Sequence, residues 1–191
     1  MLSSKARIQW IKWHAYISCF FLPLALLFTF TGVLYLLDVK GGASSYDEYI
    51  IQTEKHFPLK EIDAEVFALA FIKKHNIEII NGEKLPDNYY THDDDQGWWD
   101  FHQQITLSPL KEDSSVKVIV EYNDLWRQFV YIHKGIAGDI FYVLSILFGI
   151  SLFFSLLSGS IVALVMPKLK KNASLSMLAG FVILILAYAL S

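Results

Sequence analysis

Two histidines lie beside long apolar stretches and are the residues best placed to hold a ligand in a membrane. His14 directly precedes a charge-free stretch at residues 15–37, and His133 lies seven residues before a second stretch at residues 140–166. Neutral imidazole is a common metal ligand, and ionisable groups near membrane depth are functional candidates by default. The alternative interpretation is that both are interfacial histidines beside helix-packing surfaces.

Small residues follow each histidine at helical spacing, which lets a partner helix or a flat ligand approach closely. On the first expected helix, the face of His14 carries Ser18, Phe21, Ala25, Phe28 and Gly32. On the second, the face of His133 carries Ala137, Ser151 and Ser158. The two histidines are expected at opposite membrane faces, separated by most of the roughly 30 Å of hydrocarbon. They therefore cannot bind the same ion, and each site needs a second ligand from elsewhere.

The second apolar stretch also carries small residues at four-residue spacing, namely Ser151, Ser155 and Gly159. Such a pattern is typical of close contact between membrane helices. We therefore interpret it as a helix-packing surface.

Other candidates lie in the charged middle of the chain. His92 precedes three consecutive aspartates at residues 93–95, which can hold a hard cation if a loop makes them converge and otherwise form a solvated turn. Trp98 and Trp99 follow, and we expect one to face the core and the other a ligand or the membrane interface. The remaining histidines show no ligand spacing; they are His56, His75 and His102.

Several catalytic motifs are absent from the sequence: GxSxG, HExxH, CxxC, the Walker loop and GxGxxG. Hydrolase, zinc protease, thiol redox, nucleotide and flavin functions therefore lack their usual support. Cys19 is the only cysteine, which excludes an intramolecular disulfide. What remains is a ligand held by the membrane histidines, or no chemistry at all.

The distribution of charge predicts how the chain crosses the membrane. All 19 acidic residues lie between Asp38 and Asp139, whereas the flanking charges are basic: Lys5, Arg7, Lys12, Lys168, Lys170 and Lys171. Positive loops stay in the cytoplasm, so the N-terminus and the 168–171 segment are expected inside and the acidic middle outside. Residues 38–127 hold 9 basic and 18 acidic residues, a balance of 9 − 18 = −9, which makes nucleic acid a poor partner.

The expected fold is an α-helical integral membrane protein with three transmembrane helices and a small extracytoplasmic α+β domain between the first two. A content of 54% hydrophobic residues is high for a soluble domain. The apolar stretches, at 15–37, 140–166 and 175–190, compare with the roughly 20 residues of a spanning helix. The predicted organisation is an N-terminus with the first helix at 1–37, the outer domain at 38–132, the second helix at 133–166, a basic loop at 167–174 and the third helix at 175–191.

Within the outer domain, residues 41–45 predict a flexible exit from the first helix. A helix is expected at 63–75, with Asp63 as its cap and Val66, Leu69 and Ala70 on one face. Strands are expected at 77–80, 98–107 and 116–122, and residues 125–132 form either a last strand or the lead-in to the second membrane helix.

The chain resembles the PepSY-associated transmembrane (PepSY-TM) family of bacterial inner-membrane proteins. The resemblance rests on Trp13-His14 ahead of a helix that ends in the motif at residues 30–34. It also rests on the motif at residues 132–135 ahead of a helix that ends at residues 157–159. The order of one helix followed by several strands between them is that of a PepSY domain.

This resemblance implies haem-dependent electron transfer across the inner membrane, with some members reducing ferric siderophores in the periplasm. The family's intramembrane histidines are axial ligands of b-type haem, so His14 and His133 would ligate the haem iron here. It also implies a periplasmic location for the domain. The enzymatic activity that the resemblance implies is ferric-siderophore reduction. Reduction releases the iron because hard oxygen ligands hold Fe(II) less tightly than Fe(III).

The chain departs from larger members of the family, which have four or more spanning helices and more histidines at membrane depth. A second axial ligand would come from a homodimer or a partner membrane subunit, or from His92 or His102. The alternative function is a non-catalytic, membrane-anchored PepSY module that binds or regulates a partner protein or peptidase, with both histidines interfacial.

Overall fold

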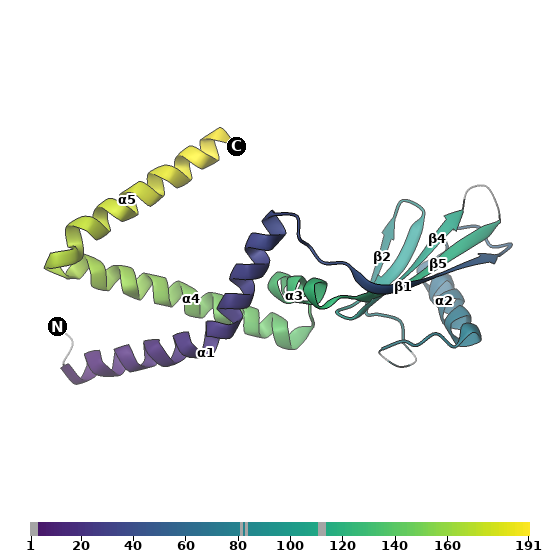
Figure 1. The fold of residues 1–191 in the computed structure, drawn as a ribbon, viewed down its shortest axis with the longest axis horizontal. Helices are drawn as coiled ribbons and strands as arrows, with labels where there is room; N and C mark the ends of the chain where they lie inside the picture. The colour runs from purple at the N-terminus through teal and green to yellow at the C-terminus, as the bar shows by residue number, and fades with distance from the viewer. Residues whose placement is uncertain (1–3, 81, 83, 111–113) are drawn as a thin grey trace. The chain divides into compact units, whose positions relative to one another are not determined.

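The computed structural model describes residues 4–80, 82, 84–110 and 114–191. The chain divides into two compact units. One unit runs to Ala25 and resumes at Ile146–Ser191, and the other is Leu26–Ser145. Two long helices contribute to both units, α1 (Ser4–Leu36) and α4 (Asp139–Val165) (Figure 1).

Three helices are long and apolar enough to cross a membrane, as the sequence predicted. They are the Ile8–Leu36 part of α1, α4, and α5 (Pro167–Leu190), with 29, 27 and 24 residues against the roughly 20 required. The third helix is longer than expected, and the separate loop predicted at 167–174 is wrong. Proline suits the first turn of a helix because no partner is needed there for an N–H, so α5 begins at Pro167 and its basic residues are helical.

The second membrane helix begins at Asp139, not at residue 133. His133 lies instead near the end of a separate helix, α3 (Leu125–Lys134). Gly135 ends α3 with a φ of 70°, and the N–H of Ile136 donates to the carbonyl of Tyr131 at 3.0 Å, a common helix-ending geometry. The predicted face shared by His133 with Ala137, Ser151 and Ser158 is therefore wrong.

The domain between α1 and α4 is an antiparallel sheet covered on one face by a helix, which confirms the predicted sheet domain at this place in the chain. The strand order is β1-β5-β4-β3-β2, so the first strand pairs with the last (Figure 1). The strands are β1 (Ala43–Gln52), β2 (Asn88–His92), β3 (Asp95–Trp99), β4 (Gln103–Leu110) and β5 (Ser115–Asn123). The helix α2 (Glu61–His75) connects β1 to β2.

Several predicted elements differ from those observed. The strand expected at 98–107 is a hairpin of β3 and β4, because the Asp100 carboxylate accepts the N–H groups of His102 and Gln103, both at 2.7 Å, and closes a turn. Residues 77–80 form no strand. The exit from α1 is shorter than expected, since β1 begins at Ala43.

The domain core lies between α2 and the sheet. The most deeply buried strand residues alternate along β4 and β5, namely Ile105, Leu107, Val116, Val118 and Val120. The expected helix face is wrong at Val66, which is 60% exposed, whereas Leu69 does pack against the core. The buried residues of α2 are Ala64, Ala68, Phe71 and Ile72. Alanines at this contact let the helix approach the sheet closely. Asp63 does not cap the helix, whose N-cap position is Lys60.

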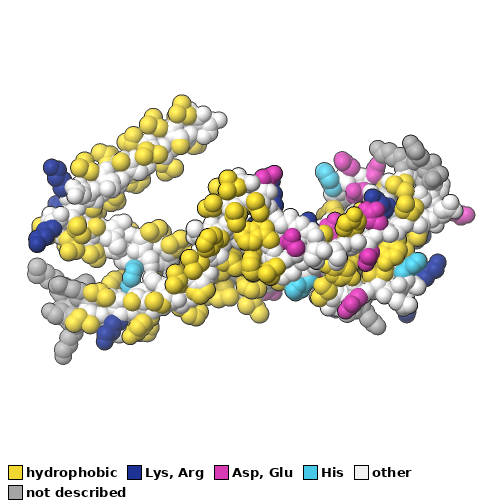
Figure 2. Space-filling view, in the orientation of Figure 1, with side chains coloured by type: hydrophobic (Ala, Val, Ile, Leu, Met, Phe, Trp, Pro, Cys, Tyr) yellow, Lys and Arg dark blue, Asp and Glu magenta, His cyan; other side chains and the backbone are white. Residues whose placement is uncertain are grey.

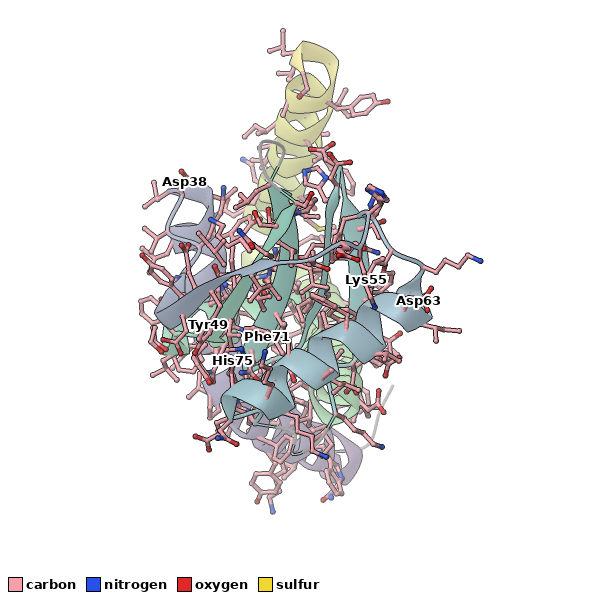
Figure 3. All side chains as sticks on the ribbon, turned by 90° about the vertical axis from the view of Figure 1, so that its right-hand side faces the viewer. Asp38, Tyr49, Lys55, Asp63, Phe71 and His75 are labelled. Atoms are coloured by element: carbon pink, nitrogen blue, oxygen red, sulfur yellow. The ribbon has the colours of Figure 1, made fainter. Side chains whose placement is uncertain are left out.

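His75 belongs to an aromatic cluster at the end of α2. Its ring lies 4.4 Å from that of Phe71, which meets Tyr49 of β1 edge-on at 5.4 Å (Figure 3). Rings at these separations pack favourably. His75 is therefore a structural residue of the domain.

Gly97 allows close packing on the sheet face opposite α2. A Cβ added here would lie 2.6 Å from the carbonyl oxygen of Ile105 and 2.7 Å from Cε1 of Tyr90. The Tyr90 hydroxyl is hydrogen-bonded to Thr106 at 2.7 Å across the sheet. The tyrosine ring is therefore held over the glycine.

We expect Gly97→Ala to destabilise the domain by about 1–3 kcal/mol, because the paired backbone of β4 cannot move aside. The measurement is the melting temperature of the full chain, followed by tryptophan fluorescence, since Trp98 and Trp99 are next to the substitution. Gly42→Ala is the control, because its nearest contact would be an ordinary 3.9 Å. Equal melting temperatures for both variants would contradict this packing.

Candidate functional site

His14 lines an apolar groove within the unit formed by residues up to Ala25 and Ile146–Ser191. The groove has a volume of about 590 Å³, within the range typical of small-molecule sites. Its α1 wall consists of Trp10, Trp13, His14, Ile17 and Phe21, and its α4 wall of Leu147, Ile150, Ser151, Phe154, Ser155 and Ser158. Three of the α4 residues are serines, whose small side chains leave space in the groove for a flat apolar ligand.

The imidazole of His14 is the ionisable group of this groove. The other ten residues that line it are apolar, aromatic or serine. A single imidazole can supply one ligand to a metal, so this wall offers one axial position and not two. Ser151 and Ser155 of the small-residue pattern predicted at 151, 155 and 159 thus line the same groove as His14, together with Ser158.

His133 belongs to the other unit, where its ring is held by the C-terminal part of α1. Its Nδ1 lies 2.6 Å from Oγ1 of Thr31, a residue that is 1% exposed. The Thr31 hydroxyl also faces the carbonyl oxygens of Leu27 at 2.7 Å and Phe28 at 3.3 Å. Two carbonyls repel a hydroxyl oxygen unless its proton points at them, so Thr31 donates there and accepts from His133.

These contacts favour one tautomer of a neutral His133 ring. With the single Thr31 proton donated to the Leu27 carbonyl, Nδ1 of His133 carries the ring proton and donates to Oγ1. The lone pair then lies on Nε2. Metal-bound histidines commonly show the same arrangement, with one ring nitrogen anchored by a hydrogen bond and the other on the metal.

The faces of the His133 ring are packed against α1. Phe28 stacks on it with ring centroids 4.7 Å apart and an interplanar angle of 16°. A Cβ added to Gly32 would lie 3.1 Å from Cε1 of His133. The sequence predicts Phe28 and Gly32 on the helix face of His14. In the structure both residues contact the ring of His133.

Further contacts hold α3 against the segment that follows α1. The Asp124 carboxylate accepts the N–H of Gly42 at 2.8 Å and, as the N-cap of α3, the N–H of Arg127 at 2.6 Å. The indole of Trp126 donates to the carbonyl of Val39 at 3.0 Å. Gly41, with a φ of 77°, has no room for a side chain beside Arg127. The start of α3 is thus fixed to this segment, and His133 near its end is fixed to α1.

The other predicted ligands lie in different places. Asp93 and Asp94 form the tight turn between β2 and β3, and Asp93 has a φ of 53°. This is the solvated turn that was one of the two predicted alternatives. His102 lies in the β3–β4 turn, directly before Gln103, and is exposed. Within residues 4–80, 82, 84–110 and 114–191, no three His, Cys, Asp or Glu side chains converge on a metal position.

Sequence reasoning missed Thr31 as the partner of His133. Thr31 and Gly32 belong to the motif at residues 30–34, which does not indicate a partner, whereas Gly135 is the local signal that separates α3 from the membrane helix. Glycine after a basic helix end is a common stop signal. It would have placed His133 on a helix of its own.

Comparison of the chain with protein-family models, curated proteins and solved structures finds no match. The PepSY-TM resemblance therefore stays a prediction.

We expect Thr31→Val to change the tautomer of His133, because valine cannot accept the Nδ1 proton. The measurement is the pair of ring ¹⁵N chemical shifts of His133 at a pH where the ring is neutral. Thr31→Ser keeps the hydroxyl and should retain a protonated Nδ1. A protonated Nε2 in the unsubstituted protein would contradict the assigned hydrogen-bond direction.

Proposed function

We propose that this chain is a bacterial inner-membrane b-haem electron-transfer protein of the PepSY-TM type, with a ferric siderophore or other ferric iron as its acceptor. The observation that carries the proposal is the apolar groove of about 590 Å³ with His14 in its wall. The walls of this groove are mostly apolar and carry one imidazole, which fits a haem better than a polar substrate. A bound haem would supply one-electron chemistry.

The groove residues would each contribute to holding a haem. The His14 imidazole would ligate the iron, and Ser151, Ser155 and Ser158 would leave space for a flat macrocycle. Phe21 and Phe148, with ring centroids 5.8 Å apart, pack beside the groove. The apolar walls exclude water, and the polarity around a haem is one of the factors that set its reduction potential.

His133 is proposed as the second ligating histidine, on the outer side. The Thr31 hydroxyl accepts from its Nδ1, which leaves the Nε2 lone pair for a metal. Such a hydrogen bond also makes the imidazole a stronger ligand. Phe28 and Gly32 limit the rotation of the ring.

Each proposed site receives one imidazole from this chain, so a homodimer or a partner membrane subunit would supply the other ligand. The surface of α4 offers a place for such a helix. A Cβ on Gly159 would meet nothing within 4 Å, and Ser155 and Gly159 line a hollow of about 320 Å³ with Ala163 and Ala173. Small residues of this kind favour close helix contact.

The orientation we propose puts the sheet domain in the periplasm. Acidic side chains gather over the sheet domain and basic side chains at the α4–α5 turn (Figure 2). Basic segments stay in the cytoplasm. Electrons would then be delivered to ferric iron outside the membrane, where reduction loosens the hold of hard oxygen ligands.

The second candidate function is a non-catalytic, membrane-anchored module that binds or regulates a partner protein or peptidase. The observation that favours it is the packing of His133 against Thr31, Phe28 and Gly32, which is also what a purely structural histidine requires. In that case His133 fixes α3 to α1 and carries no cofactor.

We expect His14→Ala to lower the haem content of the purified protein by about half, because one of the two proposed ligating histidines is lost. The pyridine haemochrome of equal amounts of protein measures it. His56→Ala is the matched control, since this histidine is exposed in the connection from β1 to α2. Wild-type haem content in His14→Ala, or an equal loss in both variants, would refute the assignment.

We expect reporter fusions to place Lys170 in the cytoplasm and Gly82 in the periplasm, because the segments proposed to lie inside carry basic residues and no acidic ones. Alkaline phosphatase should be active at Gly82 and inactive at Lys170, and a cytoplasmic reporter should show the reverse. Phosphatase activity at Lys170 would overturn the proposed orientation.

A further inference from the structure

Exposed apolar side chains gather where α1 ends and α3 begins. At the end of α1, Leu36 is 86% exposed and Leu37 and Val39 are also exposed, and Leu125, the first residue of α3, is 64% exposed. Hydrophobic side chains cover the end of α1 in Figure 2. The two segments lie side by side, because the indole of Trp126 donates to the carbonyl oxygen of Val39 at 3.0 Å.

The helix α3 has an apolar and a polar face. At helical spacing Leu125, Phe129 and Ile132 share one face, with Trp126 beside them. Leu125 is exposed, Phe129 half-buried and Ile132 buried, so the uncovered part of this face lies at the start of the helix. The rings of Trp126 and Phe129 meet edge-on at 6.2 Å. We term the exposed and half-buried apolar residues of both segments the junction face: Leu36, Leu37, Val39, Leu125, Trp126 and Phe129.

The polar face of α3 is bonded to the sheet domain. Nη1 of Arg127 lies 3.2 Å from the Glu121 carboxylate and donates to Oδ1 of Asn123 at 3.1 Å. Nε2 of Gln128 donates to the carbonyl oxygen of Asn123 at 3.0 Å. Because Glu121 and Asn123 belong to β5, whatever contacts the junction face also positions the sheet domain.

The junction face lies where the chain leaves one candidate membrane helix and approaches the next. The spanning part of α1 ends at Leu36, and α4 begins at Asp139, shortly after α3. At 1.5 Å per residue, the 29 residues of this part of α1 extend about 44 Å, which exceeds the roughly 30 Å of hydrocarbon. The last turns of α1 therefore reach the headgroup layer, where tryptophan and amphipathic helices are favoured.

Two lysine ammonium groups lie beside the junction face. Those of Lys40 and Lys134 are 5.4 Å and 4.9 Å from the centre of the Tyr35 ring near the end of α1. Lys40 is paired with Asp38, and Lys134 is exposed. Residues 38–127 have a charge balance of 9 − 18 = −9, so lipid phosphates repel most of the domain. Cations at the junction face allow this part of it to approach them.

We propose that the junction face docks on the lipid bilayer, with α3 lying along the leaflet on the side of the sheet domain. Leu125, Trp126 and Phe129 lie among the upper acyl chains, and the Lys134 ammonium contacts lipid phosphate. The bonds from the opposite face of α3 to β5 then hold the sheet domain at the membrane surface. The docking does not depend on haem.

The test places a fluorescent label on the junction face of the full chain. Cys19→Ser removes the only cysteine, and Leu125→Cys then carries a nitrobenzoxadiazole label in vesicles of phosphatidylethanolamine and phosphatidylglycerol. A lipid with a nitroxide high on its acyl chain quenches from within the bilayer, and iodide quenches from the water. We expect the nitroxide lipid to quench this label several-fold more strongly than iodide does.

The matched control is a label at Asp93→Cys in the same Cys19→Ser background. Asp93 is exposed in the β2–β3 turn. This turn lies at the other end of β3 from Trp99, whose ring is 5.6 Å from that of Tyr131 in α3. Iodide should therefore quench the control label more strongly than the nitroxide lipid does. Equal melting temperatures will show that both labelled variants fold.

A second measurement tests the contact of Lys134 with lipid. The two fluorescence lifetimes of the label at residue 125 give the ratio of docked to undocked protein. In vesicles that contain phosphatidylglycerol, we expect Lys134→Gln to lower this ratio by about fivefold, as the loss of one cation near an anionic surface allows. Lys55→Gln is the matched control, because its ammonium also lies over a ring, 5.4 Å from the centre of Phe67 in α2, and it should leave the ratio unchanged.

Iodide quenching at residue 125 as strong as at residue 93 would overturn the proposal, because the junction face would then lie in water. Protection of residue 125 from both quenchers would also overturn it, since a protein surface would then cover the face. Equal effects of Lys134→Gln and Lys55→Gln would contradict the contact between Lys134 and lipid phosphate.

Discussion

The hydrogen bond between Oγ1 of Thr31 and Nδ1 of His133 joins two parts of the chain that are 102 residues apart in sequence. An unpaired polar group in an apolar environment is costly, so each partner holds the other in place. Gly32 admits the imidazole, and Phe28 covers one of its faces. The position of α3 against α1 depends on this contact, and α3 in turn leads through Gly135 into the second membrane helix.

The two histidines have different surroundings, and each supports the proposed haem ligation in a different way. His14 lies in the wall of an apolar groove that has space for a ligand. His133 is oriented by a hydrogen bond and a stacked ring, which leave its Nε2 lone pair for a metal. Space at one site and orientation at the other are both properties of haem ligation.

Part of the fold could be predicted because its signals are local. The membrane helices follow from uninterrupted apolar runs, and β5 from the alternation of residues 116–122. The separation of β3 from β4 could not be predicted from apolar content, because aromatic and β-branched residues continue on both sides of Asp100. The pairing of β1 with β5 has no local signal in the sequence, because the two strands are far apart along the chain and meet only in the folded sheet. Likewise, His14 was identifiable from its place before an apolar helix, whereas the partnership of Thr31 with His133 required the structure.

The absorption spectrum of the full chain, purified from cells supplied with a haem precursor, tests the central claim most directly. Haem ligation predicts a Soret band that co-purifies with the protein at a constant ratio to the 280 nm absorbance, and a sharp α band after reduction with dithionite. A folded, colourless protein that takes up no haem when titrated with haemin would contradict the account. It would leave His133 as a structural contact between α3 and α1.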